Sequence, residues 1–220
     1  MPELAGKHGL KVLLGAWIGG DKAKNDRELA QAIELANRHP DVVRGLIVGN
    51  EVLLRREQTP DAMRAYIERA QAATNVPVTY ADVWEFWLMN KGLAQSVDFV
   101  TVHVLPYWED EPQPIDRAIA HVEEVMKTVD AAFDKPLLIG ETGWPSVGKQ
   151  RDGARPGVLE QARYLRELEK KTDAQQKKLN VLMRRNANKP LDGFEREQCL
   201  QLEDIVLNLR RQMFVLTFSR

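Results

Sequence analysis

Two glutamates follow apolar runs of this chain, Glu51 in VGNEVL (48–53) and Glu141 in LLIGETGWPS (137–146). Each stands where a buried strand is expected to end, and in α/β barrels the carboxyl ends of the strands carry the active site. Two convergent carboxyl groups can cleave a glycosidic bond, because one protonates the leaving oxygen while the other attacks the anomeric carbon or activates water. The alternative is that a glutamate at a strand end is a solvated loop residue or a helix cap. The elements around Glu51 and Glu141 must therefore decide between a catalytic and a purely structural role.

Short apolar runs alternate with segments of helical periodicity from residue 11 to residue 168. The runs predict buried parallel strands at 11–19, 44–51, 76–83, 98–105 and 135–142. The periodic segments predict helices at 25–40, from the N-cap Thr59 with Pro60 at the first helical position, at 114–132, and from about Gly157. Repeated strand-helix units imply a parallel sheet, doubly wound or closed as a barrel. No glycine-rich phosphate fingerprint follows any of these strands, which argues against a nucleotide-binding sheet.

The segments VGNEVL (48–53) and GETGWPS (140–146) resemble the two signatures of glycoside hydrolase family 17, barrel enzymes that act on β-1,3-glucans. The resemblance implies that Glu51 is the acid/base at the end of the fourth barrel strand and Glu141 the nucleophile at the end of the seventh. It also implies that Asn50 holds the 2-hydroxyl of the substrate, and that the reaction retains anomeric configuration and can end in hydrolysis or in transfer to another sugar.

Two further segments, LLGAWIGGD (13–21) and HVLPYWED (103–110), resemble the third and sixth strands of the bacterial branch of this family. The resemblance covers about residues 11–168. The expected fold is therefore an incomplete (β/α)8 TIM-type barrel, about strands three to seven, since the first two strands and the eighth find no counterpart. Such a sheet has two unpaired edges, which offer backbone groups for self-association.

Aromatic and polar residues gather near the ends of the predicted strands and in the segments that follow them, where they would rim the mouth of the barrel. Flat aromatic faces and polar edges suit pyranose rings. The candidate substrate-binding residues, beside Asn50, are Tyr80, Asp82, His103, Tyr107, Trp108 and Trp144. The competing interpretation is that several aromatics belong to the core, Trp84 and Trp87 above all, and that His103 has a structural or positioning role.

The character of the chain changes after Leu168, where basic residues outnumber acidic ones and tryptophan no longer occurs. We predict two domains, a partial glycosidase barrel over residues 1–168 and a basic helical tail over 169–220. Helical spacing in the tail, exemplified by Leu202, Ile205 and Leu209, predicts a helical pair broken near Pro190 and Gly193.

Composition excludes several classes of function. The 220 residues include 31 Lys and Arg against 32 Asp and Glu, a formal charge of -1, so the whole chain has no electrostatic bias toward nucleic acid or acidic lipid. The single cysteine, Cys199, excludes an internal disulfide. The four histidines lack metal-ligand spacing, so neither a metal nor another cofactor is expected. No signal peptide and no membrane-spanning run are visible.

Three functions remain open from the sequence. The first is a retaining β-1,3-glucan hydrolase or transglycosylase that uses Glu51 and Glu141. The second is a truncated, catalytically inactive barrel remnant that at most binds glucan. The third places function in the tail, where four basic residues could face a partner or nucleic acid, although interleaved aromatics for base stacking are lacking: Lys177, Lys178, Arg184 and Arg185. The compartment stays open, since relatives of this family are often periplasmic, secreted or membrane-associated.

Overall fold

The computed structural model describes the backbone of residues 1–186 and the side chains of residues 1–172. Among the sequence predictions, the helical pair with its break near Pro190 and Gly193 lies outside the described residues. The side chains of Lys177, Lys178, Arg184 and Arg185 also lie outside the described part.

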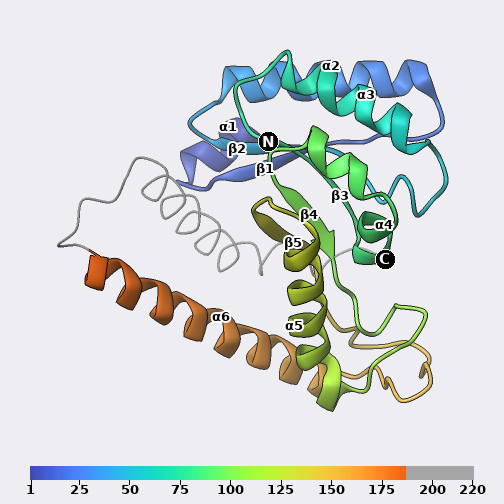
Figure 1. The fold of residues 1–220 in the computed structure, drawn as a ribbon, viewed down its shortest axis with the longest axis vertical. Coiled ribbons are helices and arrows are strands. Elements are labelled where there is room, and N and C mark those ends of the chain that lie inside the picture. Colours follow the sequence, from blue (N-terminus) through green and yellow to red (C-terminus); the bar gives the residue numbers. More distant parts are fainter. Residues whose placement is uncertain (187–220) are drawn as a thin grey trace. The chain divides into compact units, whose positions relative to one another are not determined.

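Five parallel strands form one sheet whose spatial order is the order along the chain (Figure 1). The strands are β1 Val12–Ala16, β2 Val43–Asn50, β3 Val78–Val83, β4 Val100–His103 and β5 Leu137–Glu141. The sheet curls into part of a (β/α) barrel, as the sequence predicted. Each predicted strand is present. Strand β2 has the predicted length and begins one residue earlier, whereas the other four strands are shorter than their apolar runs because those runs include residues of the flanking loops.

Helices connect successive strands, as parallel crossovers require. The connecting helices are α2 Lys22–Arg38, α3 Pro60–Gln71, α4 Trp84–Met89, the 3-10 helix η1 Lys91–Ser96 and α5 Ile115–Ala132. Helix α1 Pro2–Lys7 precedes β1, and helix α6 Val158–Asn186 follows β5. In Figure 1, α2 and α3 lie side by side over the same face of the sheet. No helix within residues 1–186 has the length and apolarity that a bilayer crossing requires.

Side-chain capping explains where helices α2 and α3 begin. The Thr59 hydroxyl accepts a hydrogen bond from the Ala62 amide at 3.2 Å, and Pro60 occupies the first helical position of α3, as predicted. Asp21 caps α2 in the same way, through the amides of Ala23 and Lys24. The cap residues Asp21 and Thr59 therefore fix the first residues of α2 and α3.

The sequence did not predict α1, α4 or η1. Each has six residues, too few to show a helical repeat of apolar positions. In α4, Trp87 is buried and its indole donates to the Thr101 carbonyl at 2.8 Å, so this side chain belongs to the core. Trp84, at the start of α4, is partly exposed, and its indole nitrogen is buried without a partner among the described residues.

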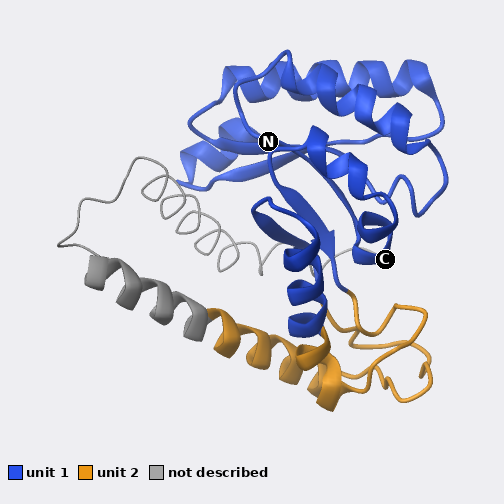
Figure 2. Ribbon diagram, in the orientation of Figure 1, with its two compact units in different colours: residues 1–104, 122–142 blue, residues 105–121, 143–220 orange. Residues whose placement is uncertain are grey.

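The chain divides into two compact units (Figure 2). The first comprises residues 1–104 and 122–142 and contains the whole sheet. The second comprises residues 105–121 and 143–220 and contains the loops that follow β4 and β5, together with α6. The predicted domain boundary at residue 168 falls inside the continuous helix α6 and stays a prediction.

Candidate active site

Glu51 follows β2 at a point where the backbone turns sharply out of the sheet. Its φ angle is +52° and that of Gly49 is +86°, both in the left-handed region. A Cβ atom on Gly49 would lie 2.8 Å from a methyl carbon of Val52, so the turn requires glycine there. The Glu51 amide still donates to the Ala81 carbonyl at 2.8 Å. Backbone conformation and this hydrogen bond together fix the direction in which Glu51 leaves the sheet.

Glu141 is the last residue of β5, opposite His103 in the parallel register with β4. Its carbonyl accepts a hydrogen bond from the Val104 amide at 3.0 Å. The preceding residue, Gly140, packs against the same histidine, because a Cβ atom there would lie 2.9 Å from the histidine Nε2 and 2.7 Å from a Thr101 methyl. Glycine at this position therefore lets the imidazole approach the end of β5.

His103 lies between the two glutamates, although β3 separates its strand from that of Glu51. The distance from His103 Nδ1 to Glu51 Oε1 is 2.9 Å, and that from Nε2 to Glu141 Oε1 is 4.0 Å. The imidazole is 1% exposed, whereas the glutamate side chains are 23% and 41% exposed. One ligating atom from each of the three residues lies within 4.8 Å of the others. The structure thus brings together two carboxyl groups that are ninety positions apart in the sequence.

The same three side chains are of the types that bind divalent cations. Sequence spacing could not reveal the group, because its members come from three different strands. A cation held there would occupy the carboxylate oxygens that act on a glycosidic bond. The arrangement therefore suits either a metal or acid-base chemistry at the carboxyl groups, and the expectation of no metal stays a prediction.

Tyr80 and Asp82 are buried in the same unit and bind each other. The Tyr80 hydroxyl donates to Asp82 Oδ2 and accepts from the Leu53 amide at 2.9 Å, while the Val83 amide donates to Asp82 Oδ1 at 2.8 Å. Leu53 lies in the turn that begins at Glu51, so the pair ties that turn to β3. Their predicted contact with substrate stays a prediction, and the contacts present here are with the protein itself.

Burial raises the pKa of the Asp82 carboxyl above its ordinary value, against the lowering effect of its hydrogen-bond donors, and raises that of the Tyr80 hydroxyl as well. Between the ordinary and the raised pKa of Asp82, the folded protein holds a proton that the unfolded chain has released. The contribution of Asp82 to the free energy of unfolding therefore falls as pH rises through that range.

We expect the stability difference between the native protein and Asp82→Asn to depend on pH accordingly. The native protein should lose stability relative to the variant as pH rises above the ordinary pKa of an aspartate, about 4, because the amide of the variant does not titrate. Urea unfolding of both proteins at stepped pH measures this difference. A difference that grows in favour of the native protein with rising pH would contradict the assignment.

Three predicted substrate-binding residues lie in the second unit and contact one another there. Tyr107 packs edge-on against Trp108 and Trp144, with ring centroids 5.1 and 5.5 Å apart. Trp144 is buried, and its indole donates to the Arg155 carbonyl at 2.9 Å. Tyr107 is also buried and donates to the Lys149 carbonyl. Of the three, Trp108 alone is exposed, at 45%, so it presents the open aromatic surface of this cluster.

Two residues beside the catalytic candidates were absent from the sequence predictions. Trp17 follows β1 and is 54% exposed, and the Arg55 guanidinium lies over its ring at 4.4 Å from the centroid. Arg55 also donates to the carbonyl of Asn50, the residue before Glu51. The position of Arg55, four residues after Glu51, could have indicated from the sequence that it lies near the site. Its contact with Trp17 could not, because Trp17 is distant in the chain.

Comparison with known proteins supports the assignment of the fold as part of a (β/α) barrel. A probable glucan endo-1,3-beta-glucosidase of Emericella nidulans is 30% identical, over 67% of this chain and 37% of its own length. A glucan 1,3-beta-glucosidase of Schizosaccharomyces pombe is 29% identical, over 67% of this chain and 50% of its own. The chain thus spans half or less of the length of these two relatives.

The solved structures include the glycoside hydrolase family 17 beta-1,3-glucanosyltransferase of Rhizomucor miehei, with 31% identity and a TM-score of 0.65. The match covers 74% of this chain and 61% of that one. An endo-laminarinase from Formosa matches at 21% identity with a TM-score of 0.60, which supports the fold alone. The similarity to family 17 is therefore supported, while the resemblance to its bacterial branch stays a prediction.

The family model of the BtgE/BtgC glycoside hydrolase domain matches residues 1–189. This range contains all five strands and all the residues of the site described above. The chain belongs to the BtgE/BtgC glycoside hydrolase domain family.

Proposed function

We propose that this protein is a retaining glycoside hydrolase or transglycosylase that acts on β-1,3-glucan, with Glu51 as acid/base and Glu141 as nucleophile. The observation that carries the proposal is the convergence of the two carboxyl groups, whose ligating atoms lie within 4.8 Å of each other. Retaining enzymes place their carboxyl groups about 5–5.5 Å apart, whereas inverting enzymes leave about 6.5–9.5 Å for a water molecule. The short separation supports a direct attack on the sugar.

The position of His103 supports the division of roles. A neutral imidazole protonated at Nε2 can accept a hydrogen bond at Nδ1 from a protonated Glu51, at the observed 2.9 Å. Its Nε2–H then faces an ionised Glu141, 4.0 Å away. One tautomer of His103 is thus compatible with one protonated and one ionised carboxyl group, the pair of states in which a retaining reaction begins.

The reaction then proceeds in two displacements. A Glu141 oxygen bonds to the anomeric carbon as the bond to the leaving oxygen breaks, and Glu51 gives its proton to that oxygen. In the second step Glu51 takes a proton from water or from a sugar hydroxyl, whose oxygen displaces Glu141 from the anomeric carbon. Water completes a hydrolysis, and a sugar hydroxyl completes a transfer.

The substrate class rests on the relatives, which are named for glucan 1,3-beta-glucosidase and beta-1,3-glucanosyltransferase activity. In the proposed reaction, Asn50 binds the 2-hydroxyl of the substrate, as the resemblance to family 17 implies. The substrate is therefore a β-1,3-linked gluco-oligosaccharide or polymer.

A product profile tests the proposal. Purified protein incubated with short β-1,3-linked gluco-oligosaccharides should yield shorter products, or shorter and longer ones if transfer competes, resolved by mass. Proton NMR during the first turnovers should show the newly formed reducing end as the β anomer. Unchanged oligosaccharides would overturn the activity, and an initial α anomer would overturn retention.

A further inference from the structure

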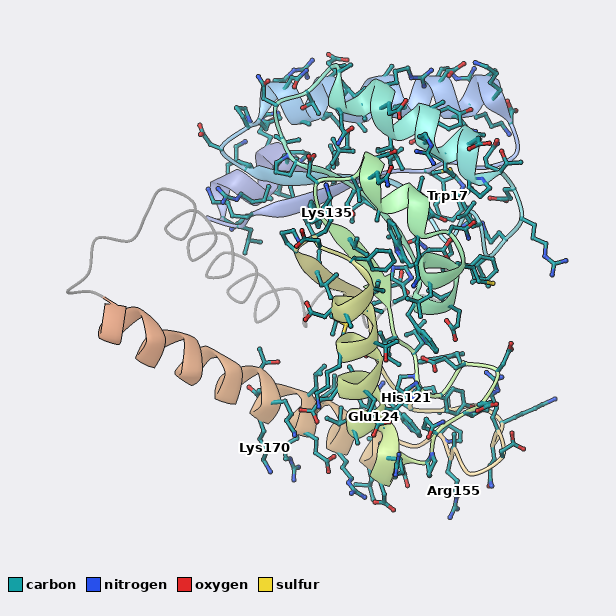
Figure 3. The ribbon with its side chains drawn as sticks, in the orientation of Figure 1. Trp17, His121, Glu124, Lys135, Arg155 and Lys170 are labelled. Carbon is teal, nitrogen blue, oxygen red and sulfur yellow. The ribbon has the colours of Figure 1, made fainter. Side chains whose placement is uncertain are left out.

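An exposed tryptophan stands on the rim of the sheet at the same end as the candidate catalytic residues. Trp17 is the first residue after β1, which pairs in parallel with β2 through Ala16 and Val48. The carboxyl ends of parallel strands share one edge of a sheet, so Trp17 and Glu51 leave that edge from adjacent strands. Figure 3 labels Trp17 where β1 leads into α2, and its side chain is 54% exposed (Figure 3).

Arg55 connects this indole to the backbone beside Glu51. Its guanidinium carbon lies 4.4 Å from the centre of the Trp17 ring, within the range of a cation–π contact. The guanidinium donates to the Ile18 carbonyl at 3.0 Å, to the Asn50 carbonyl, and to Glu57 Oε2 at 2.6 Å. One face of the indole is thus covered by a group that is itself anchored to the residue before Glu51.

The loop that carries Trp17 is held by side chains from two other elements. The Gly19 amide donates to Asn25 Oδ1 at 2.8 Å, and the Gly19 carbonyl accepts from Asn25 Nδ2 at 2.8 Å and from Gln58 Nε2 at 2.6 Å. Asn25 is 2% exposed on α2, so this anchor is fixed in the core. The exposed indole is therefore held in place before any ligand arrives, which lowers the entropic cost of binding.

We propose that Trp17 forms a carbohydrate subsite, in which the uncovered face of the indole stacks on a glucosyl unit of a β-1,3-glucan chain away from the cleaved bond. This inference rests on the proposed function. The apolar C–H face of a pyranose matches an aromatic face. A neutral ligand is indicated, because the Arg55 charge is already paired with Glu57 and leaves no excess cation for an anionic one. The role of Arg55 is to orient the indole.

A subsite away from the cleaved bond has a signature that depends on chain length. Oligosaccharides too short to reach Trp17 should be processed alike by the native protein and by Trp17→Ala. Longer oligosaccharides should show a KM raised about tenfold in the variant, equivalent to about 1.4 kcal/mol of lost binding. The kcat value should stay within about twofold, because stacking on a distant ring contributes equally to ground state and transition state.

The test measures kcat and KM for β-1,3-gluco-oligosaccharides from disaccharide to hexasaccharide. Three variants are compared with the native protein: Trp17→Ala, Trp17→Phe and Met89→Ala. Trp17→Phe keeps an aromatic face and should recover most of the affinity. Met89 is an exposed apolar residue of α4, so Met89→Ala is the control and should behave as the native protein does. Urea unfolding of each variant confirms that it is folded.

The outcomes separate this inference from the proposed function. An inactive native protein overturns the proposed function and the subsite that rests on it. An active native protein with the same length dependence in Trp17→Ala overturns the subsite alone. A loss of kcat that is equal at every chain length also overturns it, because Trp17 would then act through Arg55 and Glu51 rather than on the sugar.

Discussion

Replacement of Glu141 by Gln should abolish product formation from β-1,3-gluco-oligosaccharides, with a loss of kcat on the order of 10³-fold or more. The amide is nearly isosteric but cannot donate an electron pair to the anomeric carbon, so the covalent intermediate does not form. Glu141 ends β5 and its side chain is 41% exposed, so the substitution leaves no unpaired group in the core. The fold and the stability of the protein should therefore be retained.

The measurement compares single-turnover and steady-state product formation in the native protein, Glu141→Gln and the control Glu28→Gln. Glu28 is an exposed residue of α2 outside the site, and its variant should be fully active. Binding of an intact oligosaccharide, followed by calorimetry, should persist in Glu141→Gln. A Glu141→Gln variant with native activity would show that this carboxyl is not the nucleophile.

Replacement of Glu51 by Gln should lower kcat on β-1,3-glucan by about 10²- to 10⁴-fold, the range expected for loss of a general acid. The loss in the first step should be much smaller with an aryl β-glucoside, because a phenolate leaves without protonation. The second step still requires a base, so the glycosylated enzyme should accumulate and appear as a burst of phenolate.

The role of Glu51 is tested by the contrast between the two substrates. A burst with the aryl glucoside, together with recovery of turnover by added azide, which needs no general base, would identify Glu51 as the acid/base. Equal losses on both substrates, without a burst, would contradict that role. The Glu28→Gln variant again serves as the control, since it removes one carboxylate from an exposed helix face.

A retaining pair also predicts a pH dependence. Activity should fall at low pH, where the nucleophile gains a proton, and at high pH, where the acid loses one, so the profile of kcat/KM should be bell-shaped. In Glu51→Gln the limb at high pH should disappear for the aryl substrate. Persistence of that limb would assign it to a group other than Glu51.

The sequence predicted the strands and the larger helices because their signals are local. A parallel strand buried on both faces requires an apolar run, and a helix start requires a cap such as Thr59 followed by Pro60. The positions of Glu51 and Glu141 at strand ends follow from the same local patterns. The parallel sheet was predictable for this reason, whereas its curl into part of a barrel was implied by the resemblance to family 17.

The partners of these residues could not be read from the sequence, because a hydrogen bond between strands joins positions that are far apart in the chain. His103 was predicted at the site, but its 2.9 Å contact with Glu51 depends on the curvature that brings β4 toward the end of β2. Likewise Tyr80 and Asp82 were candidates for substrate binding from their residue types near the end of an apolar run. In the folded chain both lie in β3 and are buried against each other and against the turn of Leu53.

The sequence by itself thus determined which residue types stand near the ends of the strands. The tertiary structure decided which of these side chains contact each other and which are exposed. The placement of the Arg55 guanidinium over Trp17, which stays 54% exposed, is the clearest case. The two residues are thirty-eight positions apart and meet because β1 and β2 are neighbours in the sheet. Local sequence propensity cannot predict such a contact, because the interaction between the two side chains forms only when β1 and β2 pair.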